Sequence, residues 1–517
     1  MGFGIMRNIN VYRTRQICLL IAFFTVIIIR LFYKLDVGTI NVTDEAWYGI
    51  NAFEMFKSGN WLVPTLRGQI DYASKPPLGL WGILIGFKIF GTNLMGLRFY
   101  SAVAGLLTII VICIYLYKRF DNRYALAAAA VFPVLWQCFD MHMYRAGDMD
   151  ALFGLFYAIA IFALSEIARG DSRMIVVYWA AVGLGFMTKS MHVVVFLLVG
   201  FLYLPVIYKK LNVKDSVFGI LAGLLPTVVW GAARYQVDGF KYIRCITLGE
   251  AGDQTRSGIT LDYLRDISRE KVTWLLAALL LVRLVMYFVH GVTDDSYKGA
   301  GLPEKRNLRN WFRIFGRDVF FFIKRRYLSI LAYCVPIGVY TLAGHYMTWY
   351  IDPAYIAVIW IVSIEAIEIS DMLGKTMKKR VFVLLVALAC LFYSSVQIYQ
   401  YKDLGEGGNP VDQFGHDMTE FCDNTSGEYA GCDAYIAYDR GRYVGDRGHW
   451  ELDYVFTCNT KGNLNCLDGG VEGFLADEDS LLVLDSGLWD QYASVLTGYV
   501  FLEQNTFYVL SHDRYGE

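Results

Sequence analysis

The sequence has few charged residues, and positive and negative charges nearly balance. Only 18% of its 517 residues are charged, and 47 basic against 48 acidic side chains leave a formal net charge of -1. A soluble multidomain chain of this length would carry more charge, and a nucleic-acid-binding surface would need an excess of basic residues. The composition therefore excludes a bulk attraction to nucleic acid, and any binding must depend on local sites.

The ten cysteines lack the short paired spacing that is typical of a zinc site. Six of them lie in or beside apolar runs, where a thiol usually packs as a small hydrophobic group. The other four are in a polar C-terminal segment, where we expect disulfides in an oxidising compartment rather than a metal site. The pairing among them is left open. These four are Cys422, Cys432, Cys458 and Cys466.

Long apolar runs dominate the rest of the chain, of which 56% is hydrophobic. Arg7, Arg13 and Arg15 precede the first run, and no small-residue cleavage pattern follows it, so we expect an uncleaved first span. Eleven runs are long enough, or nearly so, to cross a bilayer. They lie at about 17–35, 99–117, 124–139, 151–167, 174–188, 191–208, 216–233, 272–290, 327–343, 350–369 and 381–400.

A twelfth apolar run, Pro77–Phe90, is short, is interrupted by glycine and contains Lys88. If this run lies in the membrane interface, every inner loop is rich in Lys or Arg, whereas a crossing at this point would reverse that bias. We therefore expect an interfacial helix, a cytoplasmic N-terminus and an extracytoplasmic segment 401–517. The basic inner loops would be Lys118–Arg123, Arg169–Arg173, Lys209–Lys214, 298–326 and Lys375–Arg380.

We expect two domains. Residues 1–400 would form a mainly α bundle of about 11–13 transmembrane helices, with a first outer loop at 36–98 that contains interfacial helices. Residues 401–517 have the composition of a soluble α/β domain, for acceptor handling or bracing. The predicted elements are strands at Ala434–Tyr438, Ser480–Leu484 and Thr506–Leu510, and a helix at 487–496 capped by Asp485 or Ser486.

Ionisable and aromatic side chains gather at the predicted outer ends of the spans. Because charged groups near a membrane are costly to desolvate, such a gathering predicts a functional site, although solvated loop ends are the alternative for any single residue. An aromatic belt also accounts for Trp349 and Tyr350. The candidate site residues are Asp44, Glu45, Tyr72, Lys75, Arg145, Asp148, Asp150, Lys189, His345 and Tyr350.

Lys75 is the candidate phosphate ligand. Two prolines follow it, and they favour extended backbone and lack amide hydrogens, so the ammonium group is held at a fixed place. A lipid phosphate at the interface is the anion that we expect it to bind, with Arg145 or Lys189 as a second cation. The alternative is that Lys75 only anchors the interfacial helix.

The carboxylates supply the candidate base. Asp44 lies just beyond the first span, in a loop that is long enough to fold over a site at the membrane surface. Glu45 is the second candidate for the same role. Asp148 and Asp150 precede the span at 151, where either carboxylate can cap the helix. Asp150 is nearer the membrane, so capping explains it less well than it explains Asp148.

These motifs, in this order, resemble those of the GT-C glycosyltransferases of the protein mannosyltransferase and lipid A aminoarabinose transferase type. The likeness covers about the first 210 residues, whereas 216–400 fits only in its spans and in the turn Trp349-Tyr350-Ile-Asp-Pro353. The matching motifs are Asp44-Glu45, Tyr72-Ala-Ser-Lys75-Pro-Pro-Leu, Arg145-Ala-Gly-Asp148-Met-Asp150 and Gly-Phe-Met-Thr-Lys189.

The resemblance implies a polyprenyl-phosphate-linked sugar as donor and inverting transfer to a hydroxyl of a lipid, glycan or protein acceptor at the outer face of a bacterial plasma membrane. Asp44 would be the base, Lys75 with Tyr72 would bind the donor phosphate, and Asp148 or Asp150 would position the sugar or acceptor. Some aminoarabinose transferases have a metal-associated acid where this chain has Ser74. We therefore expect a metal-independent monomer that needs no cofactor and binds membrane lipids but no nucleic acid.

Two other functions fit parts of the sequence. A transporter or flippase of a lipid-linked sugar would also have a dozen apolar segments, but the chain shows no inverted repeat and its charges gather at one face instead of the midplane. A scaffold with an outer partner-binding domain would need only one span. The sequence identifies neither the sugar nor the acceptor.

Overall fold

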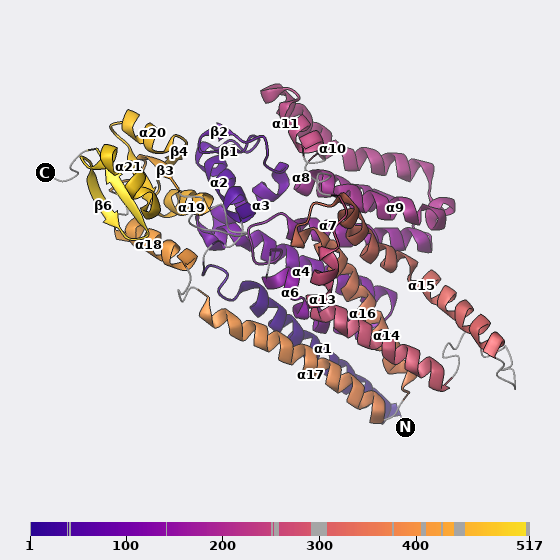
Figure 1. Cartoon of the computed structure of the whole chain (residues 1–517). Helices are drawn as coiled ribbons and strands as arrows, with labels where there is room; N and C mark the ends of the chain where they lie inside the picture. The colour runs from indigo at the N-terminus through magenta and orange to yellow at the C-terminus, as the bar shows by residue number, and fades with distance from the viewer. Residues whose placement is uncertain are drawn as a thin grey trace.

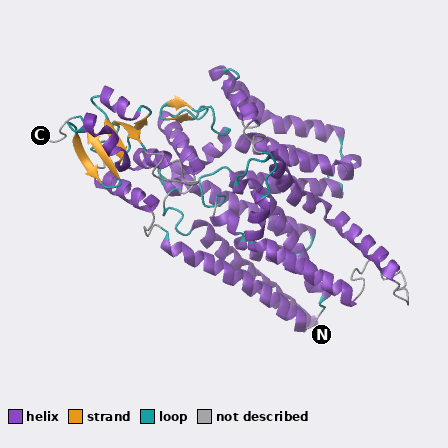
Figure 2. Ribbon diagram, in the orientation of Figure 1, coloured by secondary structure: helices purple, strands orange, loops and turns teal. Residues whose placement is uncertain are grey.

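The computed structural model describes residues 2–38, 40, 43–140, 142–249, 252, 258–290, 308–374, 377–404, 410–424, 428–438 and 450–512. Long helices form a bundle, and the C-terminal residues form a small domain at one end of it (Figure 1). Strands occur in this domain and in a short hairpin of the first outer loop (Figure 2). The mainly α fold with a small C-terminal α/β domain is therefore confirmed.

The bundle helices follow the predicted apolar runs. Within the described residues, seven helical stretches are long and apolar enough to cross a membrane. The bundle as a whole, including its shorter helices, comprises α1 Gly2–Phe32, α4 Leu94–Arg119, α5 Asn122–Val131, α6 Trp136–Asp140, α7 Asp150–Arg169, α8 Met174–Lys189, α9 Val194–Ile207, α10 Val213–Asp238, α14 Lys271–His290, α15 Leu308–Ala343, α16 Asp352–Met372 and α17 Met377–Gln400.

One of the seven stretches, Met174–Lys210, contains two helices that pack against each other. The chain turns at Ser190, whose φ is 45°, and the Tyr178 hydroxyl of α8 donates to the Phe196 carbonyl of α9 at 3.0 Å. A Cβ on Gly200 would lie 2.1 Å from that same hydroxyl. The stretch is thus an antiparallel pair, which agrees with the two separate runs predicted at 174–188 and 191–208.

The run 124–139 differs from its prediction as one continuous helix. α5 ends at Val131, and Pro133 lies in the 3-10 turn Phe132–Val134 that separates it from the short α6. Proline has no amide hydrogen and clashes with the preceding turn, so a continuous helix is broken here. The amide of Tyr144 then donates to the carbonyl of Cys138 at 2.8 Å, which folds the loop at 142–149 back onto the bundle.

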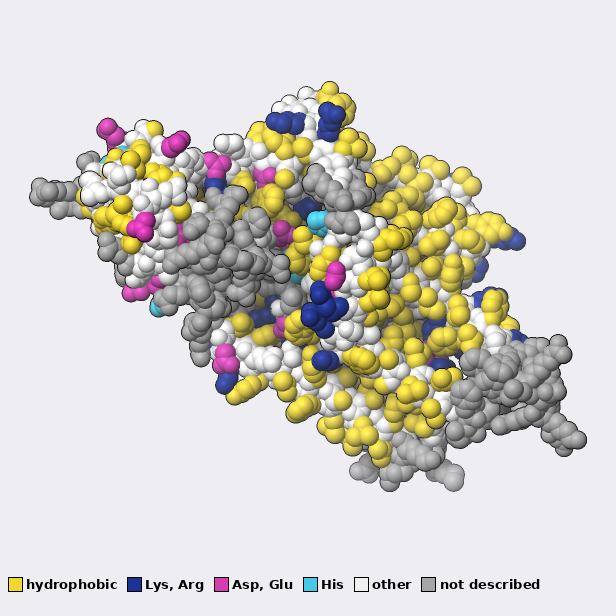
Figure 3. Space-filling view, viewed as in Figure 1, with side chains coloured by type: hydrophobic (Ala, Val, Ile, Leu, Met, Phe, Trp, Pro, Cys, Tyr) yellow, Lys and Arg dark blue, Asp and Glu magenta, His cyan; other side chains and the backbone are white. Residues whose placement is uncertain are grey.

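Apolar side chains cover much of the face of the bundle that Figure 3 shows. Leu221 and Val228 of α10 and Phe392 of α17 are each at least 60% exposed. Contiguous exposed apolar surface of this kind is unfavourable in water but is the normal lipid-facing surface of a membrane helix. The chain is therefore a multi-pass membrane protein.

The first outer loop folds into short helices and a hairpin. A Cβ on Gly86 of α3 would lie 2.0 Å from the Gly96 carbonyl oxygen of α4, so the two backbones are in direct contact. α3 begins at a proline, which suits a first helical position. That α3 lies in the interface stays a prediction. The loop comprises α2 Thr43–Ser58, β1 Thr65–Leu66, β2 Gln69–Ile70 and α3 Pro77–Phe90; α11 Lys241–Arg244 and α13 Asp262–Arg269 belong to a later loop.

The C-terminal domain has a five-stranded mixed sheet in the order β4-β3-β5-β7-β6. β3 pairs in parallel with β4 and β5, whereas β7 is antiparallel to β5 and β6. The three predicted strands are confirmed to within one residue. Asp485 accepts from Gly487 N at 2.9 Å and caps the 3-10 turn Ser486–Leu488, whereas α21 itself begins at Trp489 without a side-chain cap. The elements are α18 Pro410–Asn424, β3 Asp433–Ala437, α19 Trp450–Lys461, β4 Asn465–Leu467, α20 Gly470–Ala476, β5 Leu481–Asp485, α21 Trp489–Leu496, β6 Val500–Gln504 and β7 Phe507–Ser511.

The disulfides expected in this domain are not formed, since every cysteine that the structure describes is a free thiol. Cys422, Cys458 and Cys466 are buried among α18, α19 and β4. Burial raises the pKa of Cys422 to about 12, which keeps the thiol protonated and unreactive. These cysteines pack as small hydrophobic groups, as the cysteines of the apolar runs were expected to do.

The C-terminal domain shares a hydrophobic core with the first outer loop. Phe456 of α19 lies against Gly49 of α2, where a Cβ would meet its ring at 2.7 Å. Arg67 of the loop pairs with Asp468 at 2.6 Å. The domain therefore braces the helix whose first turn carries Asp44.

Candidate functional site

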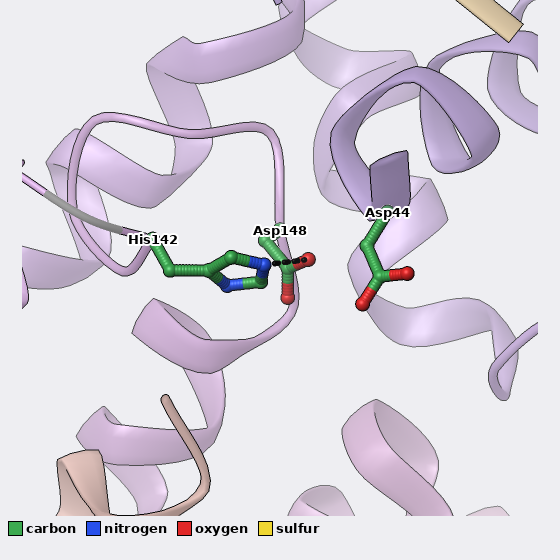
Figure 4. Close-up of side chains that lie close together, drawn as sticks. All are labelled: Asp44, His142 and Asp148. Carbon is green, nitrogen blue, oxygen red and sulfur yellow. Dashed lines mark ion pairs between the residues drawn. The ribbon is translucent and has the colours of Figure 1, made fainter. Parts of the chain in front are cut away.

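Asp44, His142 and Asp148 lie close together where the start of α2 meets the loop before α7 (Figure 4). One polar atom from each side chain lies within 4.8 Å of the other two. Asp44 is partly exposed, whereas His142 and Asp148 are 2% and 1% exposed. The fold thus joins the predicted base in the first outer loop to the carboxylate predicted in the next outer turn, at the N-terminal side of α7.

His142 is held in one orientation. Its ring stacks on Trp349 with a centroid separation of 4.0 Å and an interplanar angle of 4°. Nδ1 lies 3.2 Å from Asp150 Oδ2, and Nε2 lies 3.4 Å from Asp148 Oδ2. The imidazole therefore separates two carboxylates that would otherwise repel each other in a buried place.

Asp150 begins α7 and forms a buried ion pair with Lys189, which ends α8. The Lys189 Nζ also lies 5.3 Å from the centroid of the Tyr350 ring. Lys189 is 4% exposed and is neutralised by Asp150, so its first role is to fix the ends of two helices. Its predicted role as a second phosphate ligand stays a prediction.

The electrostatics of the loop at 142–149 depend on these neighbours. The pKa of Asp148 is raised to about 8, because burial and the charges of Asp150 and Asp44 outweigh the opposing effects of His142 and Lys189. Burial opposes protonation of His142, but Asp148 and Asp150 outweigh it and raise the His142 pKa. A cluster of buried groups with strongly perturbed pKa values is typical of a functional site.

The segment that carries Lys75 is fixed by hydrogen bonds around Asp71. The Asp71 carboxylate accepts from the Ser74 amide at 3.1 Å and from the Asn51 side chain at 3.1 Å. The Ser74 hydroxyl donates to Asn51 Oδ1 at 2.8 Å, and the Tyr242 hydroxyl donates to the Ser74 carbonyl at 2.8 Å. Lys75 therefore follows a rigid turn, as its two prolines predict.

Lys75 joins the rest of the site through His192, which lies in the turn between α8 and α9. Lys75 and Lys189 lie near enough for their charges to act on the His192 imidazole, and the Tyr350 ring centroid lies 4.8 Å from it. The His345 ring lies 6.0 Å from the Tyr350 ring, centroid to centroid. Four predicted residues thus lie around His192 and Tyr350. Asp150 and Lys189 connect this group to the cluster of Asp44, His142 and Asp148.

Tyr72 lies beside a cation that the sequence did not single out. The Lys241 Nζ of α11 lies 4.0 Å from the centroid of the Tyr72 ring. Tyr72 also packs against the apolar cluster of Met187, Trp230 and Tyr242. The structure thus places Tyr72 against α10 and α11, on the segment that leads to Lys75.

Arg145, which was predicted as a phosphate ligand, contacts the end of α1. Its guanidinium donates to four carbonyl oxygens at the end of α1, at 2.9 to 3.2 Å, and lies 4.1 Å from the centroid of the Tyr401 ring. The last carbonyl groups of a helix have no partner within the helix, so a cation at that position is stabilising. Arg145 caps α1, and its predicted role as a phosphate ligand stays a prediction.

Glu45 is also engaged elsewhere, although it was predicted as a substitute base. Arg98 donates to both carboxylate oxygens, at 2.7 and 3.1 Å, and the Gly147 amide donates to Oε1 at 2.8 Å. A bidentate buried ion pair of this kind holds the carboxylate in a fixed position. Glu45 therefore connects α2 to the loop at 142–149, and Asp44 is the acid of this pair that faces the site.

Sequence reasoning missed His142 and His192. The sequence nevertheless gave a weak indication of them. The chain has only seven histidines, and both of these lie within or beside the motifs of Arg145 and Lys189. His142 precedes the Arg145 turn by three residues, and His192 follows Lys189 by three. Imidazoles at such positions can be selected from the sequence, but their contacts with Trp349 and Tyr350 depend on the fold.

Comparison with known proteins gives one consistent family resemblance. Residues 74–230 match the family model described as dolichyl-phosphate-mannose-protein mannosyltransferase. Proteins named undecaprenyl phosphate-alpha-4-amino-4-deoxy-L-arabinose arabinosyl transferase are similar in sequence. The one from Pseudomonas savastanoi is 33% identical over 29% of this chain and 28% of its own length, and one from Pseudomonas fluorescens is 31% identical over 39% and 38%. The similarity thus spans about a third of these relatives.

The fold likeness covers the whole chain. The apo crystal structure of ArnT from Cupriavidus metallidurans superposes with a TM-score of 0.67 at 15% identity, covering 97% of this chain and 98% of that one. The same protein bound to undecaprenyl phosphate gives a TM-score of 0.64 at 14% identity, with 96% and 98% covered. The resemblance to the GT-C type that the motifs indicated is therefore confirmed, and the fold is that of ArnT.

Proposed function

We propose that this protein is a glycosyltransferase that moves a monosaccharide from a polyprenyl-phosphate carrier to a hydroxyl of a lipid, glycan or protein acceptor, with inversion. The observation that carries the proposal is the clustering of Asp44 with Asp148, Asp150 and Lys189 at one end of an ArnT-like bundle. The last three residues and Lys75 lie within the segment that matches the mannosyltransferase model. The relatives named as undecaprenyl-phosphate sugar transferases support the same donor class.

Lys75 serves the phosphate side of the reaction. A lipid phosphate leaves as an anion and needs no proton, so the site has only to stabilise the charge that develops on it. A fixed ammonium group does this far better in a partly dry site than in water. The departure of the phosphate is therefore metal-independent in this proposal, with Tyr72 beside the same segment.

Asp44 serves the acceptor side. Its carboxylate takes the proton of the incoming hydroxyl, the oxygen attacks the anomeric carbon, and the phosphate leaves with the bonding electron pair. Attack from the face opposite the phosphate inverts the anomeric centre, as in other single displacements at a sugar. Asp148 and Asp150, which are buried next to Asp44, position the sugar or acceptor.

The proposed topology places this site outside the cytoplasm. The N-terminus lies at the end of the bundle that is away from the C-terminal domain (Figure 1). A cytoplasmic N-terminus then puts the site and the domain on the outer side, in agreement with the basic inner loops. In this proposal the protein acts as a monomer in a bacterial plasma membrane.

Incubation of the purified protein with a labelled undecaprenyl-phosphate sugar, in detergent and in proteoliposomes, tests the proposal. Aminoarabinose, hexose and uronic acid donors are compared with a mixture of lipid, glycan and peptide acceptors. Transfer of label, with release of undecaprenyl phosphate, is the expected result. Movement of the intact donor across the vesicle membrane would identify a flippase, and neither transfer nor movement with any donor would contradict both functions.

A further inference from the structure

One face of α10 carries a row of polar side chains at the end of the helix that meets the first outer loop. Trp230, Arg234 and Asp238 follow one another at intervals of four residues, so they lie on the same face. All three side chains are buried, whereas Tyr235 and Val237 in the same turns are exposed. Buried ionisable side chains in a membrane helix are costly to desolvate, and they usually mark a functional site.

Each of these three side chains has a polar atom without a hydrogen-bond partner among the described residues. The atoms are Trp230 Nε1, Arg234 Nη2 and Asp238 Oδ1, and all three are buried. Arg234 Nε donates to Asp238 Oδ2 at 2.6 Å, so the two charges neutralise each other but leave one donor and one acceptor open. Buried polar atoms in native proteins are almost always satisfied, so this face suits a ligand that offers hydrogen bonds.

Tyr242 of α11 connects this face with the segment that carries Lys75. The centroid of its ring lies 4.2 Å from the Arg234 guanidinium carbon and 5.6 Å from the centroid of the Trp230 ring. Its hydroxyl donates to the Ser74 carbonyl at 2.8 Å. In a polyprenyl-phosphate sugar the sugar is bonded directly to the phosphate, so with the phosphate at Lys75 the sugar lies within reach of the α10 face.

We infer that Trp230, Arg234 and Asp238 bind the hydroxyl groups of the donor sugar, and that this sugar is uncharged. The inference rests on the proposed function, which supplies the donor. A sugar hydroxyl both donates and accepts, so it can bond to the indole and guanidinium N–H groups and to the carboxylate oxygen.

The charge of the face selects the class of sugar. Because Asp238 neutralises Arg234, the three side chains carry no net charge that would balance a buried ammonium or carboxylate group. Burial of an unbalanced charge is far more costly than burial of a hydroxyl that is hydrogen-bonded. A neutral hexose or pentose is therefore a better ligand here than an amino sugar or a uronic acid.

Binding of undecaprenyl phosphate with and without a sugar, by the purified full-length protein, isolates the contribution of the sugar. The probes are undecaprenyl phosphate alone and its conjugates with glucose, mannose, galactose and arabinose. Conjugates with aminoarabinose and galacturonic acid are the charged comparisons. The wild type should bind at least one neutral conjugate about tenfold or more tightly than undecaprenyl phosphate alone, and more tightly than either charged conjugate.

Trp230→Phe removes the indole N–H and keeps an aromatic ring against Tyr242. It should lower the gain in affinity that the sugar provides by about two- to tenfold, and leave the affinity for undecaprenyl phosphate alone unchanged. The double variant Arg234→Met/Asp238→Leu removes both charges together, so no uncompensated charge stays behind, and it should lose most of the gain. Tyr235→Phe, which replaces an exposed tyrosine of the same helix, is the matched control and should keep the whole gain.

A role in packing alone would lower the affinities for undecaprenyl phosphate and for its conjugates by the same factor, and would overturn the inference. A Trp230→Phe variant that keeps the whole gain would overturn it too. So would a wild type that gains affinity from none of the neutral sugars, or that binds a charged conjugate most tightly. If the double variant does not fold, Trp230→Phe provides the same test.

The outcome for this face can be separated from the outcome for the proposed function. A gain from a neutral sugar that depends on Trp230, without transfer of label to any acceptor, would support the inference and contradict the glycosyltransferase. Transfer of label by a protein whose Trp230→Phe variant keeps the whole gain would support the glycosyltransferase and contradict the inference.

Discussion

Arg145 and Asp148 stand three positions apart in one short turn, yet they serve different parts of the molecule. The Arg145 guanidinium satisfies four carbonyl groups at the end of α1, so its loss leaves several partly buried acceptors without this partner. We predict that Arg145→Ala lowers the free energy of unfolding by about 2–4 kcal/mol. Donor affinity should stay at the wild-type value. A thermal melt and a donor-binding titration check this, and weaker donor binding at an unchanged melting temperature would contradict the helix-capping role.

The buried pair of Asp150 and Lys189 predicts a non-additive effect on stability. Removal of one partner leaves an uncompensated buried charge, at a cost of about 3–5 kcal/mol. We therefore expect Lys189→Met to melt well below the double variant Asp150→Asn/Lys189→Met, although the double variant has more changes. Melting temperatures of both single variants and the double variant give the coupling energy. Equal melting temperatures for Lys189→Met and the double variant would contradict the assignment.

For single residues, the sequence predicted which side chains lie near the site better than it predicted what each of them does. Asp44, Lys75, Asp148 and Lys189 were found because their motifs stand at span ends, which hydropathy and charge reveal. Whether an arginine or glutamate faces the site depends on contacts between distant segments. Arg98 lies 53 residues from Glu45, and the α1 carbonyl groups lie more than 110 residues from Arg145. No local pattern shows such pairs.

Among the elements, α8 and α10 pack with their backbones in contact. A Cβ on Gly183 would lie 1.8 Å from the carbonyl oxygen of Gly223, and small residues at such contacts allow membrane helices to approach closely. We predict that Gly183→Ala lowers the free energy of unfolding by about 1–3 kcal/mol, because the added methyl group overpacks this contact. The melting temperature should fall accordingly.

Gly231→Ala, on the partner helix α10, is the matched control. Among the described residues, no atom outside the adjacent turns of α10 lies within 4 Å of the position where a Cβ would be added there, so the substitution should be neutral or slightly stabilising through helix propensity. Equal melting temperatures for the Gly183→Ala and Gly231→Ala variants would contradict the close packing.

The elements themselves were largely predictable, because a membrane span is set by hydropathy and length. The run 124–139 is the exception, and Pro133 was its visible signal. In the C-terminal domain, strands β3, β5 and β7 follow apolar patterns, whereas β4 has three residues and lies at the edge of the sheet. An element of that length has too few positions for a periodic pattern.

For the molecule as a whole, the contact between α19 and α2 makes stability depend on pH. Asp453 of α19 has a buried carboxylate oxygen that has no hydrogen-bond partner among the described residues. Burial and the nearby charge of Glu45 raise the pKa of Asp453. The folded state therefore holds this proton more tightly than the unfolded state does, and stability is lost as the pH rises above about 4 toward the folded pKa.

Asp453→Asn removes this dependence. We expect the variant to melt above the wild type at pH 7.5, by about 1–3 °C, and the difference to shrink at pH 5. Thermal melts in one detergent at the two pH values check the prediction. A difference that is the same at both pH values, or a variant that melts lower at pH 7.5, would contradict the raised pKa of the Asp453 carboxyl at this interface.

The central claim is that Asp44 and Lys75 serve the two sides of one transfer reaction. Single-turnover release of undecaprenyl phosphate from a saturating labelled donor, with donor affinity measured on the same preparation, tests it most directly. Asp44→Asn should bind the donor as the wild type does and release it about 10²–10⁴ times more slowly. Lys75→Ala should lose donor affinity. Release by Asp44→Asn at the wild-type rate would contradict the account.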